Sequence, residues 1–140
     1  MFRHPVRTLL LAAALSITAM STIGCQPSGK VGAVATESMN KGSIKVQRGD
    51  DVEIKLPENP STGYMWKRTS DLCMNVVAKV SSTFESNDNP NGAVGVGGMR
   101  IFRYHAITKG MCTMQYDLVP PGQQPSASDK GYTISIEVTD

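Results

Sequence analysis

The fold class is decided by the stretch Tyr132-Thr133-Ile134-Ser135-Ile136-Glu137-Val138, in which apolar and polar residues alternate without a break. Successive side chains of a β-strand point to opposite faces of a sheet, so this alternation predicts a strand with one buried face. The preceding stretch has the same period, with one apolar face made of Cys112, Met114, Tyr116 and Leu118. These two stretches predict the last two strands of a β domain.

The same period recurs toward the N-terminus. Five further stretches predict strands: 44–46, 52–56, 64–66, 76–84 and 99–108. The stretch 99–108 carries apolar residues on both faces, Phe102, Tyr104 and Ala106 on one and Met99 and Ile101 on the other, which leaves its buried face open. Neither a long helical pattern nor an internal repeat occurs. About seven short strands in a domain of roughly one hundred residues predict an all-β, immunoglobulin-like sandwich, with a small barrel as the alternative.

Three connections stand out by composition. The residues between Phe84 and Gly98 are polar and rich in glycine, and those between Leu118 and Gly131 contain three prolines, so both predict loops. The segment Arg48-Gly49-Asp50-Asp51 predicts a turn, in which solvation accounts for the two adjacent carboxylates.

The N-terminus predicts export and a lipid anchor. Arg3 and Arg7 precede a short apolar run, as in a signal peptide, over residues 1–24. The run ends at Thr22-Ile23-Gly24-Cys25, which resembles a bacterial lipobox, although Thr22 stands where that pattern has Leu. We therefore expect lipidation of Cys25, a flexible tether over 25–42 and the folded domain over 43–140.

The expected location follows from this leader. Gln26, rather than Asp, follows the cysteine, which resembles the pattern sorted to an outer membrane. The chain is thus expected in a bacterial cell envelope, anchored by lipid. Without use of the lipobox, a plain secretory signal would give a periplasmic or secreted protein.

Charge argues against a nucleic-acid partner. The whole chain has 14 basic and 12 acidic residues, and loss of Arg3 and Arg7 with the leader leaves 12 of each. No basic stripe remains to follow a phosphate backbone. We expect a monomer without a cofactor.

The remaining two cysteines predict a disulfide between Cys73 and Cys112, because they form an even pair in a chain expected to be exported. Two separately buried thiols are the alternative. A metal site is not expected, because the cysteines have no paired spacing and the only histidine after the leader is His105.

Catalysis is not expected either. A Ser/His/Asp system needs a histidine held by a carboxylate, and His105 falls in the middle of a predicted strand, where a cross-strand surface position is the ordinary role. The glycines of Gly95-Val96-Gly97-Gly98 do not make a phosphate cradle, because no helix follows them. The chain is not expected to be an enzyme.

The functional signal lies in the loops. The segment Asn59-Pro60-Ser61-Thr62-Gly63-Tyr64 joins two predicted strands. Pro60 fixes its own φ, Asn59 is pushed toward extended conformations and Gly63 permits positive φ, so the segment predicts a rigid loop with two exposed hydroxyls. An ordinary turn is the plainer interpretation, since turns favour these residues.

Together with the second glycine loop, this segment resembles the chagasin-like inhibitors of papain-type cysteine proteases. Those inhibitors are immunoglobulin-like domains with an Asn-Pro-x-Thr-Gly-Tyr loop, a Gly-x-Gly-Gly loop and a third loop of the Arg-Pro-Trp kind. The first is matched from Asn59 to Tyr64, with Trp66 following, and the second at Gly95, Gly97 and Gly98. The third is represented by Val119-Pro120-Pro121, which keeps a proline and lacks the aromatic residue.

The resemblance implies a reversible, competitive inhibitor that occludes the cleft of a papain-family protease. It implies that the protease contacts the three loops through the residues Asn59, Pro60, Ser61, Thr62, Gly63, Tyr64, Gly95, Val96, Gly97, Gly98, Val119, Pro120 and Pro121. Thr62 is expected nearest the catalytic cysteine. The alternative is a non-inhibitory envelope lipoprotein that uses the same sandwich for another protein contact or for structure.

Overall fold

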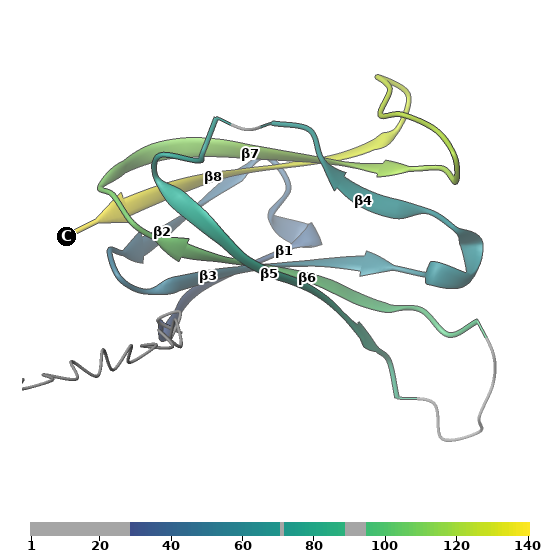
Figure 1. Ribbon diagram of the computed structural model, residues 1–140, viewed down its shortest axis with the longest axis horizontal. Helices are drawn as coiled ribbons and strands as arrows, with labels where there is room; N and C mark the ends of the chain where they lie inside the picture. The colour runs from purple at the N-terminus through teal and green to yellow at the C-terminus, as the bar shows by residue number, and fades with distance from the viewer. Residues whose placement is uncertain (1–28, 71, 89–94) are drawn as a thin grey trace, which may run out of the picture.

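The chain folds as two four-stranded β-sheets packed face to face (Figure 1). This computed structural model describes residues 29–70, 72–88 and 95–140. One sheet has the order β1-β3-β6-β5 and the other β2-β8-β7-β4. The strands are β1 (Val31–Thr36), β2 (Gly42–Gln47), β3 (Asp51–Glu58), β4 (Met65–Arg68), β5 (Val77–Ser86), β6 (Gly98–Ala106), β7 (Gly110–Val119) and β8 (Lys130–Thr139). The two single-turn 3-10 helices are η1 (Glu37–Met39) and η2 (Pro60–Thr62). The predicted all-β sandwich is therefore confirmed.

Strand pairing follows the predicted faces. β3 pairs with β6, β6 with β5, β7 with β8 and β4 with β7, all antiparallel, whereas β1–β3 and β2–β8 are parallel. Ile134 and Ile136 on β8 are fully buried, as their period predicts. On β6 the core side is that of Phe102, Tyr104 and Ala106, which settles the face that the sequence leaves open.

An aromatic contact joins the two sheets at the centre of the core. The rings of Phe102 and Tyr116 lie 4.7 Å apart between centroids, and the hydroxyls of Tyr104 and Tyr116 form a 2.6 Å hydrogen bond. Burial, followed by the neighbouring Tyr104, raises the pKa of the Tyr116 phenol far above its ordinary value. This bond connects β6 of one sheet to β7 of the other, so it fixes how the sheets are placed over each other.

The prediction of a flexible tether up to Gly42 is wrong for its second half. Residues 31–36 form β1, and η1 then leads into β2. Ala35 is fully buried in the core, and β1 pairs in parallel with β3, with one shift of register between Val31 and Ala33. The small residues that suggest flexibility also let this edge strand lie close to its neighbour, since a Cβ on Gly32 would lie 2.9 Å from that of Asp50. Within the described part of the chain the sandwich thus includes residues 31–36 and has eight strands. The expected signal peptide and Cys25 lie outside the described residues.

The expectation that Asp50 and Asp51 are both solvated in a turn is wrong for Asp51. Arg48 to Asp50 form the turn, whereas Asp51 opens β3 and is fully buried. Its carboxylate accepts hydrogen bonds from Arg103 Nε at 2.7 Å and meets Nδ1 of His105 at 2.7 Å. A buried carboxylate needs such partners, and the antiparallel pairing of β3 with β6 supplies them.

The predicted disulfide between Cys73 and Cys112 is present, with 5.2 Å between the Cα atoms. Both cysteines are buried, and Cys112 points into the core with its strand neighbours. The bridge ties the β4–β5 connection of one edge to β7. Among the described residues, no helix has the length and apolar character needed to cross a bilayer.

Candidate functional site

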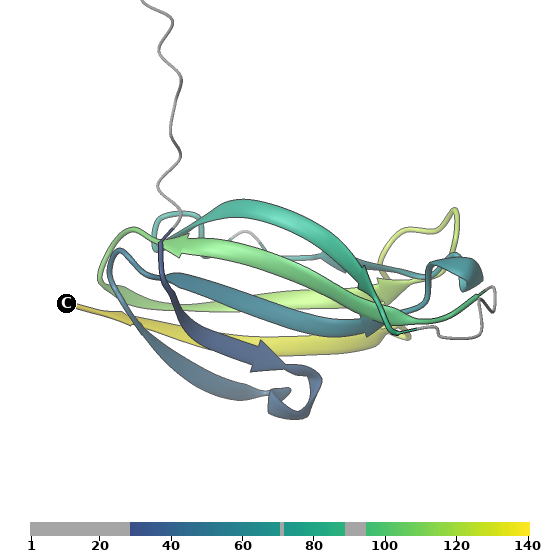
Figure 2. The same cartoon turned by 90° about the horizontal axis from the view of Figure 1, so that it is seen from below.

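Three loops meet at one end of the sandwich. They are the segment 59–64 after β3, the described residues 95–97 before β6, and the segment 120–129 after β7. Figure 2 shows them at one end, with the C-terminus at the other. The sequence alone leaves open whether these loops gather, and the strand pairing places them together because β3 ends opposite the start of β6.

The first loop is a single 3-10 turn with a cap at each end. Asn59 is extended and its side chain accepts a hydrogen bond from the backbone N–H of Ser61 at 3.1 Å. Pro60 occupies the first helical position, where the missing N–H costs nothing. Gly63 ends the turn at φ +76°, a left-handed conformation that favours glycine. These residues make the rigid loop that the sequence predicts.

Both loop hydroxyls are hydrogen-bonded inside the loop, which the sequence analysis missed. Thr62 Oγ1 donates to the carbonyl of Asn59 at 2.7 Å and accepts from the backbone N–H of Tyr64 at 3.4 Å. Ser61 Oγ donates to Asn59 Oδ1 at 2.7 Å. Ser61 and Thr62 are exposed, yet both hydroxyl protons are already donated within the loop. The loop therefore holds its shape without a partner.

The second loop is tied to the first by Asn59. Its Nδ2 donates to the carbonyl of Gly95 at 3.0 Å, so one side chain caps η2 and bridges two loops. Gly95 has φ +80°, and a Cβ there would lie 3.3 Å from Ser61 Oγ. Val96 and Gly97 are half-buried beside this contact.

Gly98 has a structural reason for being glycine. It is buried at the start of β6, and a Cβ there would lie 2.1 Å from the carbonyl oxygen of Glu85 on β5. The sequence analysis places this glycine among the expected protease contacts, and that role stays a prediction. The close approach of β5 by itself requires glycine at this position.

The third loop packs against the first through proline. A Cβ on Gly63 would lie 3.0 Å from Pro121 Cγ, so the two loops are in contact. Pro120 is half-buried and Pro121 is exposed, whereas Val119 is the buried last residue of β7. Val119 lies on the face of β7 opposite to the core residues Met114 and Tyr116 and is buried at the base of this loop, so the surface of the loop begins at Pro120.

A buried ion pair supports the base of the first loop. Glu58, the last residue of β3, is buried and accepts hydrogen bonds from Arg100 Nε at 3.0 Å and from the backbone N–H of Trp66 at 3.2 Å. The Trp66 indole donates to the carbonyl of Pro57 at 2.8 Å. The guanidinium of Arg100 lies 5.5 Å from the ring centre of Phe84. Hydrogen bonds therefore join β3 and β4, the two strands that flank the first loop, at the ends next to that loop.

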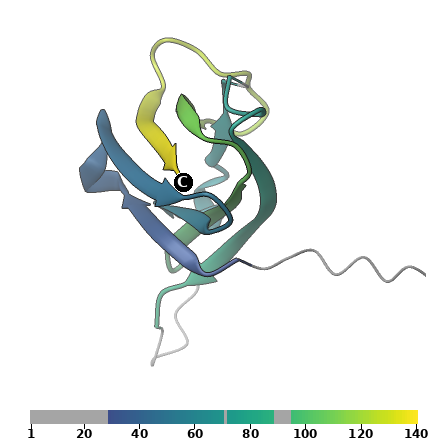
Figure 3. The ribbon, with the colours of Figure 1, turned by 90° about the vertical axis from the view of Figure 1, so that its left-hand side faces the viewer.

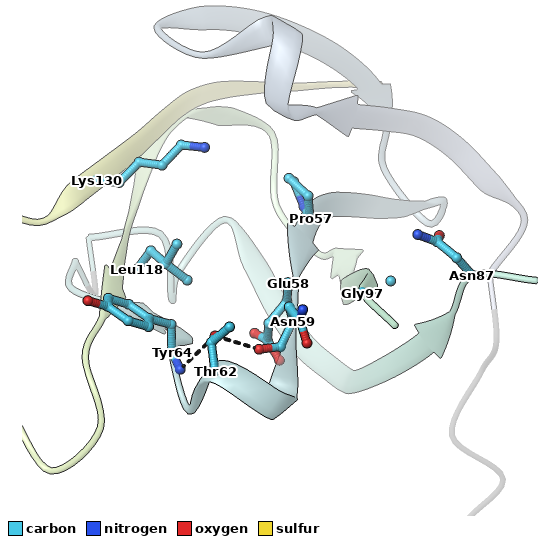
Figure 4. A pocket seen from close by; sticks show the side chains of 10 residues that line it. Pro57, Glu58, Asn59, Thr62, Tyr64, Asn87, Gly97, Leu118 and Lys130 are labelled. Atoms are coloured by element: carbon cyan, nitrogen blue, oxygen red, sulfur yellow. Dashed lines mark hydrogen bonds between the residues drawn. The ribbon is translucent and has the colours of Figure 1, made fainter. Parts of the chain in front are cut away.

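A hollow of about 510 Å³ lies beside the first loop, between the ends of the two sheets (Figure 4). Its lining is mostly apolar and backbone, and is made of Pro57, Glu58, Asn59, Thr62, Tyr64, Asn87, Gly97, Gly98, Leu118 and Lys130. Thr62 and Tyr64 border it from the first loop, and Tyr64 is exposed. This end of the molecule thus offers a projecting turn next to a concave surface.

The described residues of these three loops, 59–64, 95–97 and 120–129, include neither histidine nor cysteine. His105 and Asp51 pair at the opposite end of β3 and β6. Within the described ranges, no group of three or more His, Cys, Asp or Glu residues is placed to hold a metal ion. What this end offers is a shaped, hydrogen-bonded protein surface.

Comparison with known proteins decides the family. The model of the chagasin family of peptidase inhibitors I42 matches residues 45–136, which is most of the folded domain. The chain belongs to the chagasin family. Members are peptidase inhibitors by the family's description, and the resemblance inferred from the loops is confirmed.

Individual relatives come from an amoeba. Amoebiasin-1 of Entamoeba histolytica is 29% identical over 106 residues, which cover 74% of this chain and 96% of that protein. Amoebiasin-2 of the same organism is 22% identical over 105 residues, covering 75% and 84%.

Solved structures share the fold. The crystal structure of the cysteine protease inhibitor EhICP2 from Entamoeba histolytica superposes with a TM-score of 0.66 at 22% identity, covering 76% of this chain and 96% of that one. The solution structure of amebosin gives 0.59 at 23% identity, covering 77% and 98%. The chagasin-type sandwich is therefore the fold of this chain.

Proposed function

We propose that this protein is a reversible, competitive inhibitor of papain-family cysteine proteases, and that its three gathered loops occlude the active-site cleft. The observation that carries the proposal is the connection of all three loops at one end. Asn59 bonds to Gly95, and Gly63 lies against Pro121, so the loops form one continuous surface. Membership of a peptidase-inhibitor family supports the same role.

The internal hydrogen bonds explain how such a surface binds tightly. A flexible peptide loses conformational freedom when it enters a cleft, whereas η2 is already fixed by Asn59, Pro60 and Gly63. Because the hydroxyl of Thr62 is engaged within the loop, it is not free to act as a substrate-like donor. The turn enters the cleft as a rigid wedge, and no scissile bond needs to be presented.

The third loop contributes less than an aromatic loop would. Pro120 and Pro121 provide a small rigid surface in place of a large planar side chain. Aromatic anchors dominate many interfaces, with effects of about 2 kcal/mol or more. The first loop therefore carries a larger share of the binding free energy in this protein.

The direct test measures hydrolysis of a peptide substrate by papain or cathepsin L in the presence of the purified protein. We expect competitive inhibition at about 1 µM or below, equivalent to about 8 kcal/mol of binding free energy. Replacing the exposed Thr62 by Arg should weaken inhibition by about 30-fold or more, because the new side chain cannot enter a filled cleft.

The matched control is Thr108→Arg, an exposed threonine in the β6–β7 turn at the end of the sandwich opposite the loops. It should leave the inhibition constant unchanged, and far-UV circular dichroism should show both variants folded. Undiminished protease activity with the unaltered protein contradicts the proposal and favours a non-inhibitory role in the envelope.

A further inference from the structure

Large apolar side chains are exposed at the end of the sandwich opposite the three loops. Leu72 is 83% exposed, Met111 67%, Met74 62% and Ile107 41%. Leu72 and Met74 come from the β4–β5 connection, Ile107 from the β6–β7 turn and Met111 from the start of β7. We call these four residues the apolar end patch.

Covalent and hydrogen bonds hold the patch together. The disulfide joins Cys73, which lies between Leu72 and Met74, to Cys112, which follows Met111. The backbone N–H of Ile107 donates to the carbonyl of Val76 at 3.0 Å, and that of Thr108 donates to the same oxygen. Four exposed residues far apart in the sequence thus surround one cross-link. Large exposed apolar side chains grouped at one end of a domain are typical of a contact site.

The strand β1 begins at this same end, which faces the viewer in Figure 3, because Val31 pairs with Asp51 at the start of β3. Lys30 accepts a backbone hydrogen bond from Asp51 at 2.7 Å, and Arg103 Nη2 donates to the carbonyl of Gly29 at 3.0 Å. A Cβ on Gly29 would lie 2.7 Å from Asp51 Oδ1, so the close approach requires glycine. The buried carboxylate of Asp51 therefore fixes the point where the chain leaves the sandwich.

The expected lipidation site is close to that point in sequence. Cys25 precedes Gly29 by four residues, which even fully extended span about 14 Å. Because β1 is part of the sandwich, the sandwich can lie no farther from a lipid on Cys25 than these four residues allow. A flexible tether up to Gly42 would allow a much larger separation. A lipid on Cys25 would hold this end of the domain at a membrane surface.

We propose that the apolar end patch rests in the interface of the lipid bilayer to which Cys25 anchors the chain. The four side chains supply the apolar area that interfacial binding requires. Two of the neighbouring cations, Arg48 and Lys109, both pair with the side chain of Asp140. The apolar side chains are therefore the larger part of the proposed contact.

This placement orients the inhibitory surface. The eight residues of β3 run from Asp51 at one end to Glu58 at the loop end, a rise of about 23 Å. The three loops then point away from the membrane. A membrane-bound inhibitor of this shape meets soluble proteases that approach from the aqueous side.

Hydroxyl-radical footprinting of the full chain in bacterial membrane vesicles tests this contact. Met65, which is 53% exposed beside the three loops, is an internal reference for Met74 and Met111. From their exposure alone the three methionines should oxidise at similar rates. In vesicles we expect Met74 and Met111 to react about fivefold more slowly than Met65, because lipid covers them. The Cys25→Ser chain, which lacks the lipidation site, should return all three rates to within about twofold of each other.

Several results would overturn the proposal. Equal rates for the three methionines in vesicles, or recovery of the unaltered chain away from the membranes, would do so. Protection that persists in the Cys25→Ser chain together with a dimer mass would assign the patch to a second copy. Non-reducing mass measurement of the Cys73–Cys112 bridge checks that this variant is folded. Inhibition assayed on the same samples separates this test from that of the proposed function, since either can fail while the other succeeds.

Discussion

At the scale of single residues, Asn59 does the most for the candidate site. Its carbonyl accepts from Thr62, its Oδ1 accepts from Ser61, and its Nδ2 donates to Gly95. The sequence indicates Asn59 as a residue restrained by the following proline, which is a local property. Its role as the bridge between two loops depends on where β3 and β6 end. No local pattern encodes that position.

Asn59→Ala should therefore weaken inhibition more than it weakens the fold. Loss of the cap on η2 costs about 1 kcal/mol of stability, and the first loop also loses its tie to Gly95. We expect the inhibition constant to rise by about tenfold, equivalent to about 1.4 kcal/mol. Protease assays and urea denaturation measure the two effects. Asn59→Asp is the informative companion, because it keeps the acceptor for Ser61 and removes only the donor to Gly95. Inhibition unchanged in both variants would show that the bridge is not needed for binding.

Asp51 shows the limit of local interpretation. Its sequence neighbours predict a solvated turn, and Asp50 fits that description. Asp51 is instead buried because β6 places Arg103 and His105 beside it. The favourable environment of this carboxylate comes from residues more than fifty positions away, and only the strand register brings them together.

At the scale of elements, the pairing of β3 with β6 supports the loops. Glu58 and Arg100 close the ladder at the loop end with a buried ion pair, and Trp66 on β4 completes the hydrogen bonding of Glu58. The strands themselves are well predicted from their alternation. The exception is β1, whose small residues carry little apolar periodicity and which is stabilised by its parallel neighbour.

Breaking the Glu58–Arg100 ion pair should destabilise the end of the sandwich that carries the three loops. Arg100→Met leaves the carboxylate of Glu58 buried without its cation, which costs about 3 kcal/mol or more. We expect a lower free energy of unfolding in urea and weaker inhibition. The double variant Glu58→Gln/Arg100→Met should recover much of the lost stability, because no unpaired charge remains. A double variant that is no more stable than Arg100→Met would show that the pair does not act as a unit.

At the scale of the whole molecule, the three loops and the start of β1 lie at opposite ends. The three loops sit at one end of the sandwich, and the disulfide, the apolar end patch and the entry of the chain sit at the other (Figure 1). The core between them, centred on Tyr104 and Tyr116, couples the two ends only through overall stability.

Removing the disulfide should therefore lower the stability of the fold and leave the inhibition constant nearly unchanged. The Cys73→Ala/Cys112→Ala variant frees a loop of 39 residues in the unfolded chain, which costs about 3–4 kcal/mol in the chain-entropy model. Thermal unfolding should shift to lower temperature, while the inhibition constant measured well below that transition stays within about twofold. A large loss of inhibition in the folded variant would mean that the two ends are coupled.

The sequence by itself determined the all-β class, most strands, the disulfide pair and the loop motif of the family. Each of these depends on local period, on turn chemistry or on the count of cysteines. Only the tertiary structure decided that Val31–Thr36 is a strand, that Asp51 and Glu58 are buried, and that the three loops join through Asn59 and Pro121. These features depend on which strands pair and in which register. That choice is made by the packing of the whole core, which brings together residues that no short stretch of sequence relates.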